Sequence, residues 1–172
     1  MTLSATTAVV ECTTDAPEGT HELAAGLAPI AMAGDLLCLW GELGAGKTVF
    51  AKGFGRGLGV AGTISSPSFV LMAEYPARLP LFHLDLYRLA DAGDVIGGGL
   101  LDERQAEGVT LIEWPDRLGP ALPAGRLDVR IEGAGDGERR IFLVAHGERA
   151  ARYLDAAQPF CQAPTAPPGT GR

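Results

Sequence analysis

Residues 41–48 read Gly-Glu-Leu-Gly-Ala-Gly-Lys-Thr, which matches the phosphate-loop pattern G-x-x-x-x-G-K-[ST] at every position. The stretch follows the apolar run 36–40, which is typical of a buried strand, and a helical pattern of apolar residues comes after it. A glycine-rich turn between a strand and a helix can also be purely structural. The strand, loop and helix in this order nevertheless favour binding of a nucleoside triphosphate.

The residue types in this loop suit phosphate chemistry. Glycine at 41, 44 and 46 lets the backbone curl so that successive N–H groups point at the β-phosphate. Lys47 can reach the β- and γ-phosphate oxygens, and the Thr48 hydroxyl is placed to be an oxygen ligand of phosphate-bound Mg²⁺. The positive end of the following helix points at the same phosphates. We therefore expect a nucleoside triphosphate and Mg²⁺ as cofactors.

Two acidic residues come at the ends of strand-like stretches. Asp85 lies in the stretch 81–86, and Glu113 directly follows 109–112. Ligands bind at the carboxyl ends of strands in an open α/β sheet, so both side chains are expected to face the phosphates, hold Mg²⁺ or orient the attacking group. Asp85 could instead pair with Arg88 or cap a helix.

Nearby polar residues have weaker signals. His83 shares a strand face with Asp85 but is more typical of a packed, hydrogen-bonded histidine. The hydroxyl-rich turn 65–68, with Ser66 and Ser68, could be an ordinary turn. Its place after the phosphate-loop helix favours a segment that senses the nucleotide.

Composition limits the class of protein. The chain has 172 residues, 47% of them hydrophobic, which is enough for one sizeable core. Its formal net charge is -7, and lysine occurs only at 47 and 52, which disfavours direct binding of nucleic acid. We expect no targeting leader, because the first residues lack a basic and apolar pattern, and no membrane span, because no apolar run approaches the roughly 20 residues that one needs. We expect a cytoplasmic protein that does not bind membranes.

The cysteines give no framework. Cys12, Cys38 and Cys161 are odd in number, far apart and without metal-ligand spacing. We expect neither a disulfide nor a zinc site.

The order of patterns predicts one α/β domain over 1–161, with a Pro- and Gly-rich, disordered tail at 162–172. Asp15 and Glu18 have the spacing of a capping box at the start of a first helix. The strands expected are 8–11, 36–40, 69–75, 81–86, 109–112, 126–131 and 139–145, the last two forming an antiparallel hairpin. Helices are expected from Asp15, after the phosphate loop, loosely over 91–107, and over 148–157.

Four motifs occur in a fixed order along the chain, and their combination is far more specific than the phosphate loop alone. They are the phosphate loop, Ser-Ser-Pro-Ser-Phe at 65–69, His-Leu-Asp-Leu-Tyr-Arg at 83–88, and Ile-Glu-Trp-Pro-Asp at 112–116. Together they resemble the TsaE family, also called YjeE, over roughly residues 15–157. The resemblance implies a single P-loop domain with a mixed, mostly parallel sheet flanked by helices, binding of ATP and Mg²⁺, and weak hydrolysis alone. It also implies a complex with the TsaD and TsaB proteins, in which ATP turnover supports threonylcarbamoyl transfer to the tRNA adenosine beside the anticodon. On this view tRNA is met only through the complex.

The resemblance assigns roles by position. Phosphate contacts fall on Leu43, Gly44, Ala45, Gly46, Lys47 and Thr48. The metal falls on Thr48, Glu113 and Asp85, and catalysis on Lys47, Asp85 and Glu113. Switch contacts fall on Ser66 and Ser68, and contacts near the base on Glu18 and Arg139. Serine replaces the family's threonine at 65 and 68, and Val49 stands where a second threonine is common.

Other classes stay open on the residues alone. A GTPase needs an Asn-Lys-x-Asp element, and the chain contains no asparagine, which favours ATP. A small-metabolite kinase usually needs an arginine-bearing lid, and Arg78, Arg88 and Arg104 do not form a recognisable one. A module that uses ATP only as an assembly signal needs the same Mg²⁺ ligands as a hydrolase.

Overall fold

A computed structural model describes residues 7–67, 71–90, 93 and 103–161. Its centre is a seven-stranded mixed sheet with the order β1-β7-β6-β2-β5-β4-β3. The strands are β1 (Ala8–Thr14), β2 (Leu36–Trp40), β3 (Met72–Tyr75), β4 (Leu81–Asp85), β5 (Val109–Glu113), β6 (Arg126–Glu132) and β7 (Arg139–His146). The helices are α1 (Pro17–Leu27), α2 (Lys47–Leu58) and α4 (Glu148–Ala157), with short 3-10 turns η1 (Ala28–Ile30), η2 (Glu103–Glu107), η3 (Pro115–Ala121) and η4 (Gln158–Phe160).

The parallel part of the sheet lies at its centre. Strand β2 pairs in parallel with β5 and β6, and β5 pairs in parallel with β4. The remaining pairs, β1 with β7, β6 with β7, and β3 with β4, are antiparallel and lie toward the edges. Strands buried on both faces read as continuous apolar runs, which is why β2 is Leu-Leu-Cys-Leu-Trp. The predicted mixed α/β sheet and the hairpin of β6 and β7 are confirmed.

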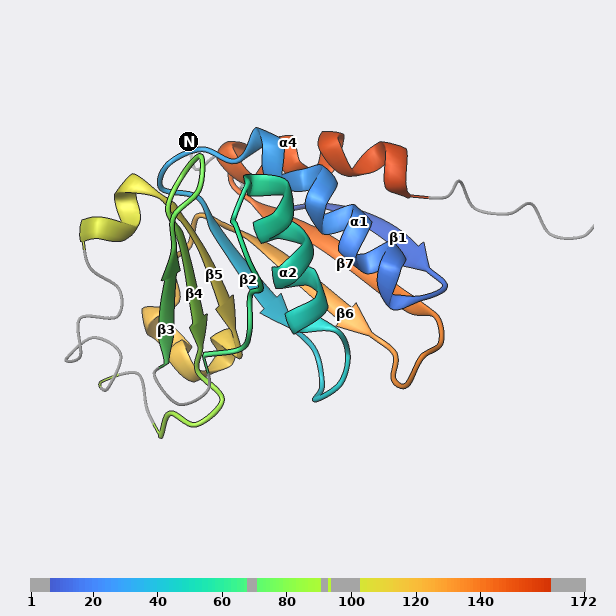
Figure 1. Cartoon of the computed structure of the whole chain (residues 1–172), viewed down its shortest axis with the longest axis horizontal. Coiled ribbons are helices and arrows are strands. Elements are labelled where there is room, and N and C mark those ends of the chain that lie inside the picture. Colours follow the sequence, from blue (N-terminus) through green and yellow to red (C-terminus); the bar gives the residue numbers. More distant parts are fainter. Residues whose placement is uncertain (1–6, 68–70, 91–92, 94–102, 162–172) are drawn as a thin grey trace, which may run out of the picture.

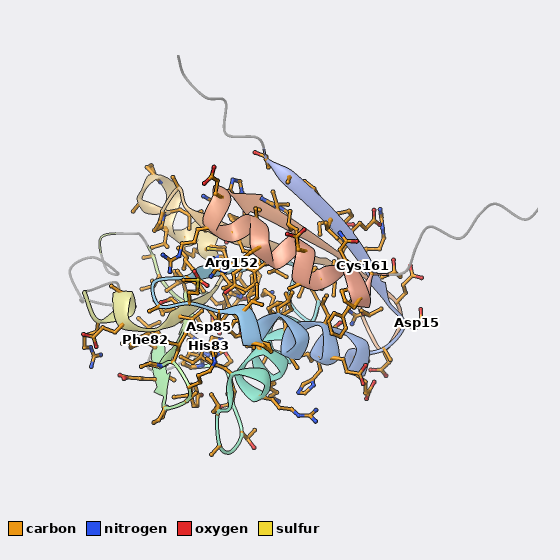
Figure 2. All side chains as sticks on the ribbon, turned by 90° about the horizontal axis from the view of Figure 1, so that it is seen from above. Asp15, Phe82, His83, Asp85, Arg152 and Cys161 are labelled. Atoms are coloured by element: carbon orange, nitrogen blue, oxygen red, sulfur yellow. A yellow bond between two sulfur atoms is a disulfide. The ribbon has the colours of Figure 1, made fainter. Side chains whose placement is uncertain are left out.

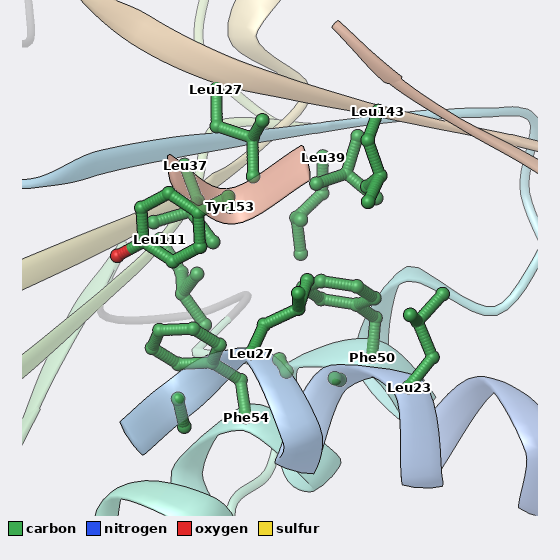
Figure 3. Packing of buried hydrophobic residues seen from close by; sticks show 14 of the residues in the cluster. Leu23, Leu27, Leu37, Leu39, Phe50, Phe54, Leu111, Leu127, Leu143 and Tyr153 are labelled. Atoms are coloured by element: carbon green, nitrogen blue, oxygen red, sulfur yellow. The ribbon is translucent and has the colours of Figure 1, made fainter. Parts of the chain in front are cut away.

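Two apolar clusters hold the layers together. The larger one joins α1, α2 and α4 to one face of the sheet, and Figures 1 and 3 show this arrangement. Phe50 and Phe54 of α2 lie with Leu37 and Leu111 of the sheet in this core. The smaller cluster lies on the other face of the β4 and β5 region, where Leu118 of η3 covers it. Burial on both faces fixes the central strands, and these strands carry the candidate site.

The start of α1 differs from the prediction. The N-cap is Ala16, with extended backbone and no side-chain cap hydrogen bond, so the expected capping box of Asp15 and Glu18 is wrong. Pro17 occupies the first turn, where its missing N–H costs nothing and its fixed φ suits a helix. The proline therefore sets the boundary one residue later than the side-chain pattern suggested.

Other expectations fall partly outside the described residues. The expected helix 91–107 lies mostly there, and its described end is the 3-10 turn η2. Ser68, residues 69–70 of an expected strand, and the tail 162–172 also lie outside. In the part of the chain that is described, no helix is both long and apolar enough to cross a bilayer.

The cysteine prediction is wrong in one respect. Cys12 of β1 and Cys161, just after η4, form a disulfide with Cα atoms 4.3 Å apart, although 149 positions separate them in sequence. Because α4 packs against β1 and β7, it brings the end of the described chain to β1. Cys38 is buried and free, and its burial, with a contribution from Asp128, raises the pKa of its thiol to about 12.

Candidate nucleotide-binding site

The phosphate loop lies between the carboxyl end of β2 and the first turn of α2. Gly41, Gly44 and Gly46 all have positive φ, at 153°, 81° and 112°. A Cβ at position 44 or 46 would meet nothing within 4 Å, so space does not restrict the residue type there. The positive φ is what favours glycine at these two positions. At position 41 a Cβ would also lie 2.6 Å from the carbonyl oxygen of Ile131. The three glycines of the predicted phosphate loop therefore all have the positive φ that a tightly curled backbone needs.

Lys47, the first residue of α2, lies at the base of this loop. Its Nζ donates hydrogen bonds to the carbonyl oxygens of Gly41 (2.6 Å) and Glu42 (2.9 Å). The same Nζ lies 4.2 Å from the ring centroid of Trp114. Burial lowers the pKa of this ammonium, although the nearby carboxylates of Glu113 and Asp85 act in the opposite direction. A cation partly removed from water is well suited to attract phosphate oxygens.

Glu113, the last residue of β5, is held by two neighbours. Thr48 Oγ1 donates to Glu113 Oε1 over 3.3 Å, and His83 Nε2 lies 2.9 Å from the same oxygen. His83 is fully buried and Glu113 is 3% exposed. The structure therefore brings together Thr48 and Glu113, as predicted. His83 also contacts the site directly, through Glu113, whereas the sequence pattern favoured only a packed histidine.

Asp85, the last residue of β4, lies beside Glu113 because the two residues are register partners in parallel strands. One carboxylate oxygen accepts a hydrogen bond from the Ser66 hydroxyl, and the other accepts from the backbone N–H of Tyr87 over 3.0 Å. The expected switch serine thus contacts one of the expected acids. Figure 2 labels His83 and Asp85, which lie together and away from Cys161.

The phosphate loop, both acids and Ser66 border one cavity of about 480 Å³. Its described lining comprises Leu43, Gly44, Gly46, Lys47, Thr48, Val49, Ser66, Asp85, Tyr87, Arg88, Glu113 and Trp114. Two further lining residues, Tyr87 and Trp114, had no predicted role, and their rings lie 4.9 Å apart. Trp114 has φ 59°, an unusual backbone state for a non-glycine residue that places its indole over Lys47. Its sequence signals were its place directly after Glu113 and its membership of the motif at 112–116.

The cavity fits a magnesium ion that is bound to phosphate. In the described residues, no group of three or more His, Cys, Asp or Glu side chains could hold a metal by itself. Mg²⁺ in triphosphate sites needs only one or two protein oxygens, because phosphate and water supply the others. Thr48 Oγ1 and Glu113 Oε1 offer that pair, 3.3 Å apart, and Asp85 lines the same cavity.

Two predicted residues lie elsewhere. Glu18 lines a separate hollow of about 270 Å³ with Pro17, His21, Glu22, Val49 and Arg56. Val49 lines both this hollow and the main cavity. Arg139 lies behind the phosphate loop, where its guanidinium contacts the carbonyl oxygens of Ala45 and Gly44. Ala45 itself is buried in the core, at 1% exposure.

Comparison with known proteins decides the family. The family model described as "Threonylcarbamoyl adenosine biosynthesis protein TsaE" matches residues 14–141. The chain belongs to the TsaE family. A Bacillus subtilis (strain 168) tRNA threonylcarbamoyladenosine biosynthesis protein TsaE is 44% identical over 135 residues, covering 77% of this chain and 84% of that protein. Its Streptomyces coelicolor namesake is 39% identical over 138 residues, covering 76% and 93%.

A solved structure supports the same assignment. The crystal structure of YdiB from Bacillus subtilis superposes with a TM-score of 0.72 at 36% identity, covering 91% of this chain and 98% of that one. The TsaE resemblance that the four motifs indicated is therefore confirmed, together with the single α/β fold.

Proposed function

We propose that this TsaE-family chain is a Mg²⁺-dependent ATPase that acts with TsaD and TsaB in threonylcarbamoyladenosine modification of tRNA. The observation that supports it best is the convergence of Lys47, Thr48 and Glu113 on one cavity at the phosphate loop. The family match supplies the pathway, since its members are threonylcarbamoyl adenosine biosynthesis proteins. The sequence contains no asparagine, so it has no Asn-Lys-x-Asp element for guanine, and this supports adenine as the base.

Each residue at the cavity has a role that follows from its position. Backbone N–H groups of the loop and the start of α2 bind the phosphates, with Lys47 adding a point charge at the β- and γ-oxygens. Thr48 and Glu113 supply the protein oxygens for Mg²⁺, which when bound neutralises charge on the transferring phosphate. Asp85 lies beside Glu113, where it orients the attacking water. Its hydrogen bond with Ser66 links this carboxylate to the hydroxyl-rich segment, which senses whether the nucleotide is bound.

A kinase lid receives no support from the arginines. Arg78 donates to the carbonyl oxygens of Ala28, Pro29 and Ala31, and Arg104 pairs with Glu74 at the edge strand. Arg88 lines the cavity, whereas Arg78 and Arg104 do not. One arginine does not make a lid with a pocket for a second substrate, so hydrolysis is the better proposal.

The test is a titration of ATP hydrolysis by the purified chain, alone and with its cognate TsaD and TsaB. We expect weak turnover alone and strong stimulation by the pair. Glu113→Gln and Asp85→Asn should keep nucleotide affinity while stimulated turnover falls by about 100-fold or more. Glu107→Gln, an exposed acid outside the cavity, is the matched control. ATP binding with flat hydrolysis in the wild type would instead favour an assembly module.

A further inference from the structure

Arg139 is a buried cation with an unusual set of partners. It is the first residue of β7, and it is 5% exposed. Its Nε donates to the carbonyl oxygen of Ala45 over 2.8 Å, and Nη2 lies 3.4 Å from that of Gly44. Within the described residues, no carboxylate forms an ion pair with it. Its charge is therefore balanced by backbone dipoles, two of them from the phosphate loop.

The same guanidinium fastens the turn between β6 and β7. Nη1 donates to the carbonyl oxygens of Gly137 (2.8 Å), Ala134 (3.2 Å) and Glu138 (3.2 Å), and Nη2 donates to that of Gly135. Close packing adds to this link, because a Cβ at Gly133 would lie 2.9 Å from Arg139 Cδ. The turn and the phosphate loop lie at the same end of the sheet, since β6 and β2 are parallel neighbours (Figure 1).

The orientation of one peptide unit follows from these contacts. In a trans peptide the C=O and the next N–H point in opposite directions. Because the Ala45 carbonyl points at Arg139, the N–H of Gly46 points away from it. A phosphate loop works by aiming such N–H groups at its ligand. Arg139 therefore holds this donor in place from behind, and its positive charge adds to the field that attracts an anion.

We propose that Arg139 is a positioning residue for the phosphate loop, which acts through the Ala45–Gly46 peptide and the β6–β7 turn rather than by contact with the base. This inference rests on the proposed binding of ATP and refines the role that the sequence assigned to Arg139. Arg139 should therefore affect the binding of any ligand with a phosphate chain, whether or not the ligand carries a base.

The experiment compares ATP with inorganic tripolyphosphate, which has the phosphates but no base, by calorimetric titration in Mg²⁺. Arg139→Gln should weaken both ligands by a similar factor of about ten or more, since it removes charged hydrogen bonds to two loop carbonyls. Arg139→Lys keeps the charge without the planar fork and should fall between Gln and wild type. Arg140→Gln, the exposed neighbour paired with Glu11, should bind both ligands like the wild type.

Each outcome decides the matter. A loss confined to ATP would show contact with the base, and unchanged affinity for both ligands in the folded variants would show a merely structural arginine; either result overturns the proposal. If Arg139→Gln does not fold, the test becomes a comparison of amide hydrogen-exchange rates between Arg139→Lys and the wild type, both without ligand. Faster exchange of the amides in 42–46, with unchanged α4, supports the proposal, and unchanged exchange contradicts it. Failure of the wild type to bind either ligand would instead reject the proposed function.

Discussion

His83 is the buried group that fixes the Glu113 carboxylate in the cavity. Its Nε2 lies 2.9 Å from Glu113 Oε1, and among the described residues its Nδ1 has no hydrogen-bond partner. A carboxylate accepts hydrogen bonds, so His83 donates through Nε2 to Glu113. A buried polar atom without a partner is costly, which indicates that the Glu113 contact is the reason for a histidine here.

We expect His83→Leu to lower partner-stimulated ATP hydrolysis by about 10- to 100-fold and to raise the Mg²⁺ concentration needed for half-maximal rate. His83→Gln should retain most activity, because its amide nitrogen can donate from nearly the same place. Turnover measured across a Mg²⁺ titration checks both variants. Equal loss in both variants with normal Mg²⁺ dependence would show that the site needs the ring for packing only.

The sequence predicted the cavity residues that belong to motifs. Lys47, Thr48, Asp85 and Glu113 line one cavity, as expected from a loop pattern and from acids at strand ends. His83 was missed as a site residue because alternation gives the face of a strand but not the partner across it. Trp114 was missed because its role depends on a left-handed backbone state that no local pattern indicates.

At the level of elements, α1 and α2 pack through glycines. A Cβ at Gly53 would lie 2.2 Å from the carbonyl oxygen of His21, and one at Gly57 would lie 2.3 Å from that of Ala25. Both obstacles are backbone atoms of α1, which cannot move aside as a side chain can. The glycines that weaken α2 as an isolated helix are therefore required for its close approach to α1.

We expect Gly53→Ala to destabilise the protein by about 2 kcal/mol or more, because overpacking outweighs the roughly 1 kcal/mol that helix propensity favours. Lys52→Gly, at the adjacent exposed position, should cost about 1 kcal/mol and calibrates propensity in the same helix. Urea unfolding measures both. A stabilised Gly53→Ala variant would mean that the two helices are not in backbone contact.

Helix α4 is anchored by the buried Asp35, which precedes β2. The carboxylate accepts hydrogen bonds from Arg149 (2.8 Å), the Tyr153 hydroxyl (2.6 Å) and Arg152, and from the Met32 N–H (2.9 Å). Burial alone raises the pKa of Asp35, but these donors outweigh it, so its pKa lies below the ordinary value of 3.8. The ionised carboxylate is thus favoured in the folded state.

The depressed pKa gives a signed dependence on pH. The stabilisation by Asp35 should be complete well above pH 3.8 and should be lost as pH falls through the lower folded pKa. We expect Asp35→Asn to lower the free energy of unfolding at pH 7 by about 1–3 kcal/mol and to flatten the acid limb of the stability profile. Asp155→Asn, exposed on α4, is the control. A variant that keeps the wild-type acid limb would contradict this role.

Element prediction succeeded where periodicity is strong and failed where tertiary contacts decide. The central strands, α2, α4 and the hairpin follow apolar patterns that the structure repeats. The turn η3 contains two prolines and a non-helical Gly119, so no helical period could announce it. The pairing of β1 with β7 and the Cys12–Cys161 link join distant segments, about which local sequence says nothing.

For the whole molecule, charge sets the expected contact with nucleic acid. Aspartate and glutamate number 21 against 14 lysines and arginines, and several arginines are taken up by internal partners, among them Arg126, Arg139 and Arg152. We expect the isolated chain to bind tRNA weakly, with a shallow salt dependence, because few cations can displace counterions. Filter binding across a salt series checks this. Tight, steeply salt-sensitive binding by the chain alone would contradict the proposal that tRNA is reached through the complex.

The most direct test of the central claim is the affinity for ATP and Mg²⁺, measured by calorimetric titration of the wild type and of Lys47→Ala. Lys52→Ala, which removes the chain's other lysine from the exposed side of the same helix, is the matched control. If the cavity binds the triphosphate, Lys47→Ala should weaken ATP by about tenfold or more, while Lys52→Ala binds like the wild type. Equal affinity in wild type and Lys47→Ala would contradict the account, because ATP would then bind somewhere other than the phosphate loop.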